Sequence, residues 1–583
     1  MKSTQALKIT LIAMIGIALS GCELPPLYNS ENSSSAGNST SEDSSQYTSE
    51  EISSMIEGAT SLVFSGTSTV EITNNNGQVT SSGAYVYITG AGDYVLSGSA
   101  SNMQVQVNAD SASVNLLFNG VTLGNTKNAP LYVVNAEETD IIVAPGTVNT
   151  LTDATSYTYE NATEQDPNAT ICSKDDLNIQ GTGTLNVTGN FKHGIFSSND
   201  LRFKATEGVG PTINITATND AIKGKDSVQI ENGVFDLTAG GDGLQSDTTD
   251  TVEKGFILIK GGTFDIHSGD DGLQAYRYVQ IDDGNFTLNT TGKGIISDLD
   301  IRVNGGTFGI TSVDDAVHST GTATLAGGNF TVSSSDDGYH AETTLTVSGG
   351  THLITKAYEG YEATTINISG GTSHITSSDD GLNAAGGDGS STWGGPTSGT
   401  GTINISDGYL YVNATGDGLD SNGSIFITGG TTLVNGPTSN GNGPLDCGDQ
   451  SGYISQTGGT LVAVGSSGMA VGVTQGSQYS AIVRHTSAVA SSSQYVVLDS
   501  ANNPVITFKP AKNSYSIAVS SSLFTSGAYR LYSGGTLSNP TSTTDGYSLG
   551  GTYSGGTQIT SWSFSSSLIH YSYGSGTSGP GGR

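Results

Sequence analysis

Pairs of aspartates that precede a glycine or an alanine recur along the middle of this sequence. The pattern Asp-Asp-Gly-apolar-x-small occurs at 270–275, 336–341 and 379–384, and a copy with alanine in place of glycine occurs at 314–319. Oxygen ligands in this number, on bends whose glycines leave backbone carbonyls free, favour Ca²⁺ over softer metals. We therefore expect Ca²⁺ at some of these positions. The candidate ligands are the paired aspartates and the single aspartates of degenerate copies: Asp220, Asp242, Asp270, Asp271, Asp314, Asp315, Asp336, Asp337, Asp379, Asp380 and Asp417.

The residue directly before the small position defines an acidic column. Its members are Asp220, Asp242, Asp271, Lys293, Asp315, Asp337, Glu359, Asp380 and Asp417. If the chain coils once per pattern, neighbouring carboxylates lie ~4.8 Å apart and repel by about 3–4 kcal/mol at an effective dielectric constant of ~20. Bound cations would remove this repulsion. The competing interpretation is a turn in which each aspartate hydrogen-bonds its own backbone.

Lys293 is the single cation in the acidic column. It is either a charge plug between Asp271 and Asp315 or the base of a β-elimination, for which Lys223 and Lys225 are the other candidates. A base needs a pKa near the working pH, whereas flanking carboxylates favour the ammonium and raise its pKa. We therefore favour the plug and expect no catalytic residue.

The spacing of the small residue predicts the fold. It stands at 221, 243, 272, 294, 316, 338, 360, 381 and 418, so most intervals are 22 residues and two are lengthened by insertions. A Gly-Gly-Thr/Asn-Phe motif keeps the same period at 261–264, 305–308 and 327–330. Two motifs with one period are typical of a solenoid. Because the segments between glycines alternate as strands do, we predict an all-β parallel β-helix of about 22 residues per coil.

The register predicts which side chains point outward. The residue after the small one is always apolar or aromatic, as in Leu273, and we expect it to point inward. The next residue is usually polar and forms an outward column, in which His318 and His340 are one coil apart. Three interpretations of these two histidines remain open: they are solvated, they bind a metal ion, or they contact a sugar. As carbohydrate-binding candidates we take Gln245, Gln274, His318, His340 and Asn383 from this column, and Trp393 from the inserted loop 386–401.

The N-terminal residues are typical of an export signal. Lys2 and Lys8 precede an apolar run at 9–19, which is too short to span a membrane. The run ends in Leu-Ser-Gly-Cys, which resembles a bacterial lipobox with Cys22 as the lipidated residue. We expect a protein held at the bacterial envelope, on the outer membrane or cell surface, by this lipid alone. The predicted organisation is a signal peptide (1–22), a disordered serine-rich tether (23–58), a parallel β-helix (59–478), a β-rich cap (479–571) and a disordered tail (572–583).

Composition excludes several classes. The 583 residues include 82 glycines, and 20 Lys and Arg against 53 Asp and Glu leave a net charge of −33. Nucleic acid is an unsuitable partner, because its binding needs a positive surface. Apolar residues are 34% of the chain, which argues against full disorder.

Cys172 and Cys447 lie about eleven predicted coils apart, too far for a disulfide, so we expect two free, buried thiols. We expect a monomer.

Residues from about 60 to 570 resemble the bacterial family of carbohydrate-binding domain-containing proteins. The match is carried by Ser-Lys-Asp-Asp-Leu at 173–177, by 219–228 and 240–247, and by the Asp-Asp-Gly-Leu pairs. The resemblance implies a calcium-binding, right-handed parallel β-helix, similar in fold to pectate-lyase-like polysaccharide lyases, that binds cellulose or acidic polysaccharide. Lys293 and Glu359 in the acidic column depart from the family pattern, as does Asn199 before Asp200.

Three functions follow as hypotheses. The leading one is a surface-anchored, calcium-dependent protein that binds a polysaccharide, either cellulose or an acidic plant or algal glycan, without cleaving it. The second is a lyase that cleaves a uronate polymer by β-elimination. The third is a structural adhesin in which calcium serves only rigidity.

Overall fold

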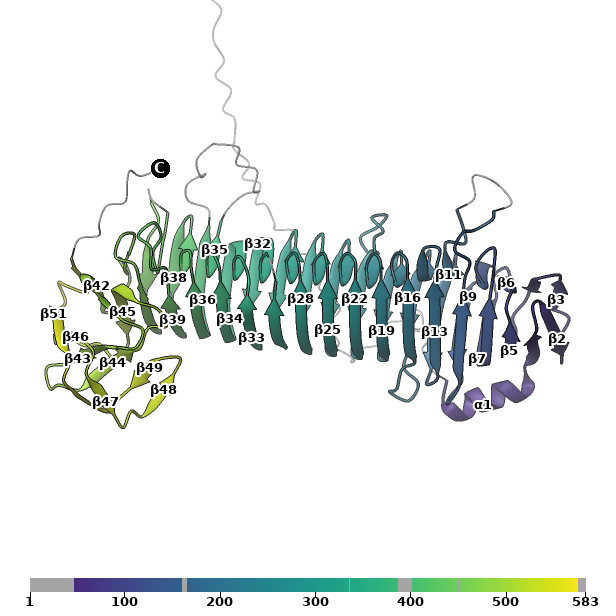
Figure 1. The fold of residues 1–583 in the computed structure, drawn as a ribbon, viewed down its shortest axis with the longest axis horizontal. Coiled ribbons are helices and arrows are strands. Elements are labelled where there is room, and N and C mark those ends of the chain that lie inside the picture. Colours follow the sequence, from purple (N-terminus) through teal and green to yellow (C-terminus); the bar gives the residue numbers. More distant parts are fainter. Residues whose placement is uncertain (1–46, 160–164, 335, 386–400, 449–450, 575–583) are drawn as a thin grey trace, which may run out of the picture. The chain divides into compact units, whose positions relative to one another are not determined.

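The computed structural model describes residues 47–574, with the exception of 160–164, 335, 386–400 and 449–450. In these residues the chain forms one α-helix and a long series of β-strands, most of which belong to one mainly parallel sheet that winds into a β-helix (Figure 1). This confirms the predicted all-β parallel β-helix with a β-rich C-terminal part. No helix within the described residues is both long and apolar enough to cross a membrane.

Each coil contributes a strand to each of three parallel ladders. The short-strand ladder directly follows the bend that carries the acidic column, and from Ile222 onward its separate strands have three residues. Its strands are β4 Tyr85–Ile88, β6 Gln104–Asn108, β8 Leu131–Asn135, β11 Ala169–Ser173, β14 His193–Ser197, β17 Ile222–Gly224, β20 Leu244–Ser246, β23 Leu273–Ala275, β26 Ile295–Ser297, β29 Val317–Ser319, β35 Leu382–Ala384 and β37 Leu419–Ser421, with the first residues of β32 Tyr339–Val347 and β34 Tyr361–Ser377.

The other two ladders complete each coil. The middle ladder contains β9 Glu138–Val143, β12 Asp176–Gly181, β15 Asp200–Phe203, β18 Ser227–Ile230, β21 Phe256–Ile259, β24 Tyr278–Ile281, β27 Asp300–Val303, β30 Thr322–Leu325, β38 Ser424–Ile427 and β40 Ile454–Gln456, with parts of β7 Ser113–Gly124, β32, β34 and β36 Thr402–Ala414. The long-strand ladder contains β10 Val148–Thr152, β13 Thr184–Gly189, β16 Thr212–Ala217, β19 Val234–Ala239, β22 Thr263–Ser268, β25 Asn285–Thr290, β28 Thr307–Ser312, β31 Asn329–Ser333, β33 Thr351–Lys356, β39 Thr431–Asn435 and β41 Thr460–Gly465, with the last residues of β7, β34 and β36.

The strand register agrees with the predicted columns. Leu273 pairs with Leu244 in the preceding coil and with Ile295 in the following one, and all three are buried. His318 pairs with His340, and both are partly exposed. The parallel pairing therefore places each side chain next to its counterpart one coil away, inside and outside the β-helix.

Aromatic rings stack through the core of the long-strand ladder. The ring centroids of Phe264 and Phe286 are 4.6 Å apart, and those of Phe308 and Phe330 are 4.3 Å apart, with nearly parallel planes. His352 continues the stack, 5.2 Å from Phe330. Burial lowers the pKa of His352, and the neutral ring donates to the Gly349 carbonyl and accepts from the Tyr339 hydroxyl. A polar ring thus replaces phenylalanine because both of its nitrogens find partners.

The Gly-Gly step before Phe264, Phe308 and Phe330 has a steric reason. The second glycine lies in the left-handed region, with φ of 101° at Gly306, where a side chain is strained. A Cβ at Gly306 would also lie 2.9 Å from the Gly284 carbonyl oxygen and 3.1 Å from the ring of Phe308. The motif therefore makes both the bend and the room for the aromatic stack.

The N-terminal end of the β-helix is closed by two antiparallel pairs and by a helix. β1 Thr60–Ser65 pairs with β2 Thr69–Thr73, and β3 Val79–Ser82 pairs with β4, while β5 Gly92–Ala100 joins β1 to β7 in parallel. The helix is α1 Ser49–Gly58, which begins with a capping box of Thr48 and Glu51.

Helix α1 corrects the predicted tether at 23–58. Ile52 is fully buried against Leu117 and Ile142 on the outside of the sheet. These outward positions of β7 and β9 are apolar and need a cover, so the last ten residues of the predicted tether are ordered by burial. The first part of the predicted tether, up to residue 46, lies outside the described residues.

Antiparallel strands end the β-helix on the C-terminal side. β41 pairs with β45 Ser514–Ser521, which pairs with β42 Ser480–Val489, and β42 pairs with β52 His570–Tyr573. A second sheet has the order β48 Ser542–Thr544, β49 Tyr547–Leu549, β44 Pro504–Phe508, β43 Tyr495–Leu498, β46 Gly527–Ser533 and β51 Thr557–Phe564, and β47 Thr536–Ser538 pairs with β50 Thr552–Ser554. This arrangement pairs the free edge of β41, which would otherwise invite association. Strand β52 extends two residues into the predicted tail at 572–583.

Cys172 and Cys447 form no disulfide with each other, as predicted. Cys172 is buried, and burial raises the pKa of its thiol to about 12. The prediction that Cys447 is also buried was wrong, because this residue is half-exposed. Cys447 lies beyond β37, where the short-strand ladder is reduced to a single bridge between Leu419 and Leu445.

The aromatic stack predicts a large difference between two neighbouring substitutions in β25. We expect Phe286→Ala to destabilise the protein by about 3–5 kcal/mol, since it removes a ring from the middle of a close-packed stack. Thr287→Ala, at the adjacent outward and exposed position, should change the stability by less than about 0.5 kcal/mol. Calorimetric melting of both variants measures the effect, and equal losses would contradict the role of the stack.

Candidate functional site

The acidic column and the outward column of the short-strand ladder meet along one side of the β-helix. In each coil the acidic residue and the residue three positions later lie on the same side of the bend. His318 Nδ1 lies 2.7 Å from Asp315 Oδ2, and His340 Nδ1 lies 3.3 Å from Asp337 Oδ2. We name the two columns together the acidic strip. Its members are the acidic column (Asp220, Asp242, Asp271, Lys293, Asp315, Asp337, Glu359, Asp380, Asp417) and the outward column (Lys223, Gln245, Gln274, Ile296, His318, His340, Glu362, Asn383, Asp420).

One oxygen of most column aspartates holds the backbone of the next coil. Asp242 Oδ1 accepts the N–H of Asp271 at 3.0 Å, and Asp315 Oδ1 accepts the N–H of Asp337 at 3.0 Å. A hydrogen bond to a charged acceptor is worth about 1.5–3 kcal/mol. The aspartates thus bridge consecutive coils, whereas the turn we weighed as the alternative to metal binding joins an aspartate to its own bend. The second oxygen of each carboxylate remains for the strip.

Three groups of carboxylates converge within the strip. The ligand atoms of each group lie within 4.8 Å of one another, and the groups are Asp242 with Asp270 and Asp271, Asp314 with Asp315 and Asp336, and Asp380 with Asp417 and Asp420. Burial, and then the neighbouring carboxylates, raise the pKa of Asp242 to about 7 and that of Asp417 to about 8. The same causes raise the pKa of Asp420 to about 7. These shifts show that each added negative charge is unfavourable there, so the groups suit a cation with oxygen ligands.

Around Asp315, basic side chains offset the effect of burial and of the neighbouring carboxylates on the pKa. Lys293 Nζ lies 2.6 Å from Asp314 Oδ2 and 3.5 Å from Asp315 Oδ2. Burial alone would raise the pKa of Asp315, but the hydrogen bond from His318 and the charge of Lys293 outweigh it and hold that pKa below its usual value. Burial likewise opposes the charge on Lys293, yet its hydrogen bond to Asp314 and the nearby carboxylates raise its pKa. A charged Lys293 has no free electron pair with which to accept a proton.

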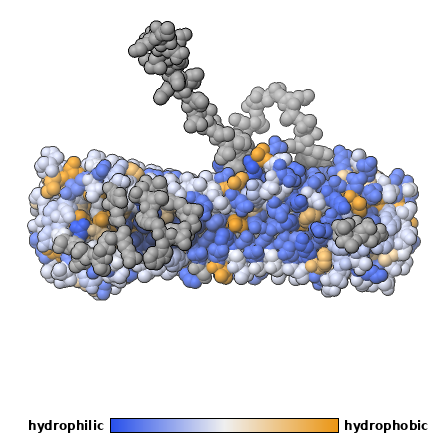
Figure 2. Space-filling model, turned by 90° about the horizontal axis from the view of Figure 1, so that it is seen from above, coloured by the Kyte–Doolittle hydropathy of each residue, from blue (hydrophilic) through white to orange (hydrophobic). Residues whose placement is uncertain are grey.

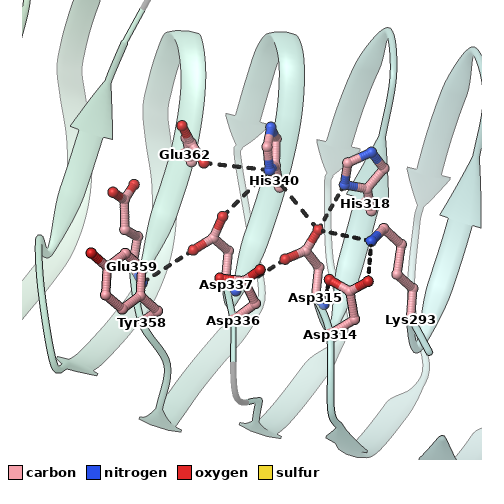
Figure 3. Close-up of a pocket in the computed structure, with 10 residues that line it drawn as sticks. All are labelled: Lys293, Asp314, Asp315, His318, Asp336, Asp337, His340, Tyr358, Glu359 and Glu362. Carbon is pink, nitrogen blue, oxygen red and sulfur yellow. Dashed lines mark hydrogen bonds and ion pairs between the residues drawn. The ribbon is translucent and has the colours of Figure 1, made fainter. Parts of the chain in front are cut away.

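The strip is hollowed beside these residues. A cavity of about 340 Å³ is lined by Lys293, Asp314, Asp315, His318, Asp336, Asp337, His340, Tyr358, Glu359 and Glu362 (Figure 3). His340 points between the carboxylates of its own coil and the two adjacent coils. Burial disfavours its charged form, but the hydrogen bond to Asp337 and the charges of Glu362 and Asp315 raise the pKa of His340 to about 9.

Three predicted metal ligands stand outside these carboxylate groups, and one of them, Asp337, forms a group with His340 and Glu362 instead. Asp220 Oδ2 lies 3.0 Å from the buried His193 Nδ1, and the pKa of Asp220 is lowered because His193 and the N–H of Asp242 outweigh its burial. A histidine therefore holds the position that a metal ion would take. Asp379 belongs to no group of metal-ligand type in the described part of the chain.

The predicted carbohydrate-binding residues form part of the strip. The Gln245 side chain donates to Gln274 and Asp242 and accepts from Lys223. Asn383 donates to Glu359 Oε1 at 3.0 Å, and the ring centroids of His318 and His340 are 4.7 Å apart. Trp393 lies outside the described residues.

The two remaining lysine candidates differ in their surroundings. Lys223 Nζ lies 2.5 Å from Asp247 Oδ2. Lys225 is exposed, and the partner of the neighbouring Asp226 is Lys254, at 2.6 Å.

Sequence reasoning missed the contribution of Glu362 and Asp420. Both lie in the outward column; Glu362 forms a group with Asp337 and His340, and Asp420 forms one with Asp380 and Asp417. The spacing of three residues from Glu359 to Glu362 and from Asp417 to Asp420 was the available signal, since the same spacing joins Asp315 to His318. His193 carries no comparable signal, because it precedes the regular part of the pattern.

The chain is similar to proteins described as carbohydrate-binding. Residues 82–338 match the family described as carbohydrate-binding domain-containing protein. A protein of this description from Acetivibrio thermocellus is 42% identical over 118 residues, which cover 20% of this chain and 41% of that relative. The chain thus matches less than half of the relative's length.

A solved structure is also similar in sequence. It is described as the polysaccharide lyase-like protein from C. thermocellum in a gadolinium derivative, and it is 35% identical. The match covers 42% of this chain and 92% of that chain, with a TM-score of 0.36. The part of the chain that matches the carbohydrate-binding domain family, residues 82–338, includes the acidic strip from Asp220 to Asp337.

Proposed function

We propose that this chain binds a polysaccharide along the acidic strip through Ca²⁺ ions held between its carboxylates, and that it does not cleave the polymer. The observation that carries the proposal is the group formed by Asp380, Asp417 and Asp420. Within the described residues no Lys, Arg or His lies at ion-pair distance from these three carboxylates. Oxygen ligands alone, on a bend, suit Ca²⁺.

The repetition of the strip supports a repeating ligand. The strip offers carboxylate, amide and imidazole groups in successive coils, and hydrophilic side chains gather over the middle coils on the side seen in Figure 2. A cation bound to the strip leaves positions for oxygen atoms of a second molecule. Such bridging makes a uronate polymer acceptable to a chain with a net charge of −33. We therefore place an acidic plant or algal glycan first, with cellulose as the neutral alternative.

The lyase alternative needs a free base near the cation. Lys293, the lysine of the acidic column, is ion-paired with Asp314, and its pKa is raised. An unprotonated lysine at neutral pH would require the opposite shift. The geometry therefore favours binding without elimination.

A pH-dependent melting experiment tests the cation sites. The raised pKa values of Asp242, Asp417 and Asp420 mean that the folded, metal-free chain keeps protons that the unfolded chain has lost between about pH 4 and pH 8. Its stability should therefore fall as the pH rises through this window, with a Tm several degrees lower at about pH 8 than at about pH 5. Ca²⁺ binds the ionised carboxylates and should restore most of the loss.

Asp417→Asn provides the matched control for this experiment. In the unaltered chain, Asp417 Oδ1 accepts a hydrogen bond from the N–H of Gly443 at 2.5 Å. The asparagine keeps an oxygen at this position but removes the charge. The slope of Tm against pH and the increase in Tm on adding Ca²⁺ should therefore both decrease. A metal-free Tm that stays constant or rises between these pH values, with no response to Ca²⁺, would show that the strip needs no cation.

Co-sedimentation with pectate, alginate and cellulose tests the ligand. We expect binding in Ca²⁺ and its loss in chelator, because the cation bridges the two sets of oxygen atoms. The double variant Asp271→Asn/Asp417→Asn should weaken binding at least about tenfold. Asp265→Asn, an exposed change on the outward side of β22, should bind as the unaltered chain does.

The same samples separate the three functions. Absorbance from an unsaturated product, lost in Lys293→Ala, would assign a lyase and contradict the proposal. Absence of both product and binding for all three polymers would leave only the structural role.

We further propose that the chain is anchored to the bacterial envelope through a lipid on Cys22. The support is the Leu-Ser-Gly-Cys sequence after a short apolar run. In a bacterial host, a labelled fatty acid should enter the chain, and Cys22→Ala should lose the label and leave the membrane fraction. A label retained in Cys22→Ala would refute the anchor.

A further inference from the structure

His340 lies at the centre of three carboxylates that come from three coils. Its Nδ1 atom is 3.3 Å from Asp337 Oδ2 in its own coil and 3.4 Å from Glu362 Oε2 in the following coil. Asp315 Oδ2, from the preceding coil, is 3.9 Å away. All four side chains line the cavity in Figure 3. This is a mixed nitrogen and oxygen cluster, unlike the all-oxygen groups elsewhere in the strip.

The distances fit one small metal ion. Ligands held ~2.0–2.1 Å from a tetrahedral ion lie ~3.3 Å from one another. The separations of His340 Nδ1 from Asp337 and from Glu362 have this length, and the ligand atoms of these three residues lie within 4.8 Å of one another. A single ion could therefore contact all three with small side-chain rotations.

The rest of the fold already fixes these ligands. Asp337 Oδ1 accepts the N–H of Glu359 at 3.1 Å, which directs Oδ2 toward His340. The strand pairing aligns His340 with Glu362 in the next coil. Ligands whose other atoms are held by hydrogen bonds are pre-oriented for metal binding.

An independent observation points to a missing cation in the same cavity. Glu359 is 9% exposed, and its Oε1 accepts from Asn383. Its Oε2 is buried and has no hydrogen-bond partner among the described residues, although the side chain lines the cavity. A buried acceptor without a donor costs about 1–3 kcal/mol, which a nearby cation would offset.

We propose that His340, Asp337 and Glu362 bind one first-row transition-metal dication of the Zn²⁺ type, with Asp315 as the fourth protein ligand. The imidazole nitrogen makes this site distinct in chemistry from a calcium site, since Ca²⁺ takes oxygen ligands and Zn²⁺ takes nitrogen as well. The proposal goes beyond polysaccharide binding, because neither His340 nor Glu362 belongs to the all-oxygen groups.

The competing explanation is an ion pair in which a protonated His340 itself is the cation. One Nδ1–H can donate to one carboxylate in good geometry, whereas three carboxylates surround it and Glu359 Oε2 remains without a donor. A metal ion satisfies several oxygens at once.

Metal counting on the full chain, purified without a histidine tag and stripped of metal, tests the site. After dialysis against micromolar Zn²⁺ in the presence of millimolar Ca²⁺, we expect one Zn²⁺ per chain by mass spectrometry of the elements. Co²⁺ in place of Zn²⁺ should give the visible absorption of a four-coordinate ion with a nitrogen ligand. His340→Ala and Glu362→Gln should each weaken binding at least about tenfold.

The controls separate this site from the others. His267→Ala removes an exposed histidine that lies 3.6 Å from Asp265 on another ladder and should leave Zn²⁺ binding unchanged. Asp417→Asn should impair the response to Ca²⁺ but not the uptake of Zn²⁺, so the calcium proposal and this one fail separately.

Circular dichroism identifies variants that do not fold, and Glu362→Gln, which keeps the shape of the side chain, then decides the outcome. Zn²⁺ binding that is the same in both folded variants, or that millimolar Ca²⁺ abolishes in the unaltered chain, would overturn the proposal in favour of the ion pair.

Discussion

Parallel register places each side chain of this β-helix beside its counterpart in the next coil, and everything else in the structure depends on this constraint. For apolar groups the stacking is favourable, as in the run of rings from Phe264 to Phe330. For carboxylates it is unfavourable, because each coil adds a like charge within a few ångströms of the previous one. The acidic column therefore exists at a cost that other groups in the strip must offset.

The chain offsets this cost in three ways. One oxygen of each of several aspartates accepts a backbone N–H from the next coil, as Asp242 does for Asp271. A nitrogen-bearing side chain enters some coils: His193, whose pKa burial lowers, lies beside Asp220, and the charged Lys293 lies beside Asp314. In other coils burial and neighbouring charge raise the carboxylate pKa, as they do at Glu359 and Asp417. The raised pKa values thus mark the coils in which a bound cation has the most to contribute.

Sequence alone was sufficient for the features that repeat. The period of 22 residues, the inward column of Leu273 and the outward column of His318 all follow from the spacing, because parallel pairing carries one register from coil to coil. Features that depend on the conformation of the bend did not follow. The bend brings the residue three positions after the acidic residue beside it. Glu362 and Asp420 therefore belong to the site, although the repeat did not predict this.

Sequence analysis also did not predict the single departures from the repeat. The packing of Ile52 on Leu117 and Ile142 orders a helix inside a serine-rich stretch, and such a contact between distant segments leaves no periodic signal. Likewise, the half-exposed position of Cys447 reflects the end of the short-strand ladder after Leu445. Periodicity predicts the interior of a solenoid, while its ends are decided by packing.

The departures within the acidic column carry the most specific chemistry. A column of aspartates alone would make every coil an equivalent oxygen site. Lys293 interrupts that series, and on its C-terminal side His318, His340, Glu359 and Glu362 replace the amides and aspartates found in other coils. Lys293 already neutralises Asp314, so a second cation is needed only on the far side of Asp315, where His340 and the two glutamates stand. The replacement of one oxygen ligand by an imidazole in those coils changes which ion fits, while the backbone, the register and the remaining carboxylates stay the same. A repeated scaffold can in this way present different sets of ligand atoms in successive coils along one strip.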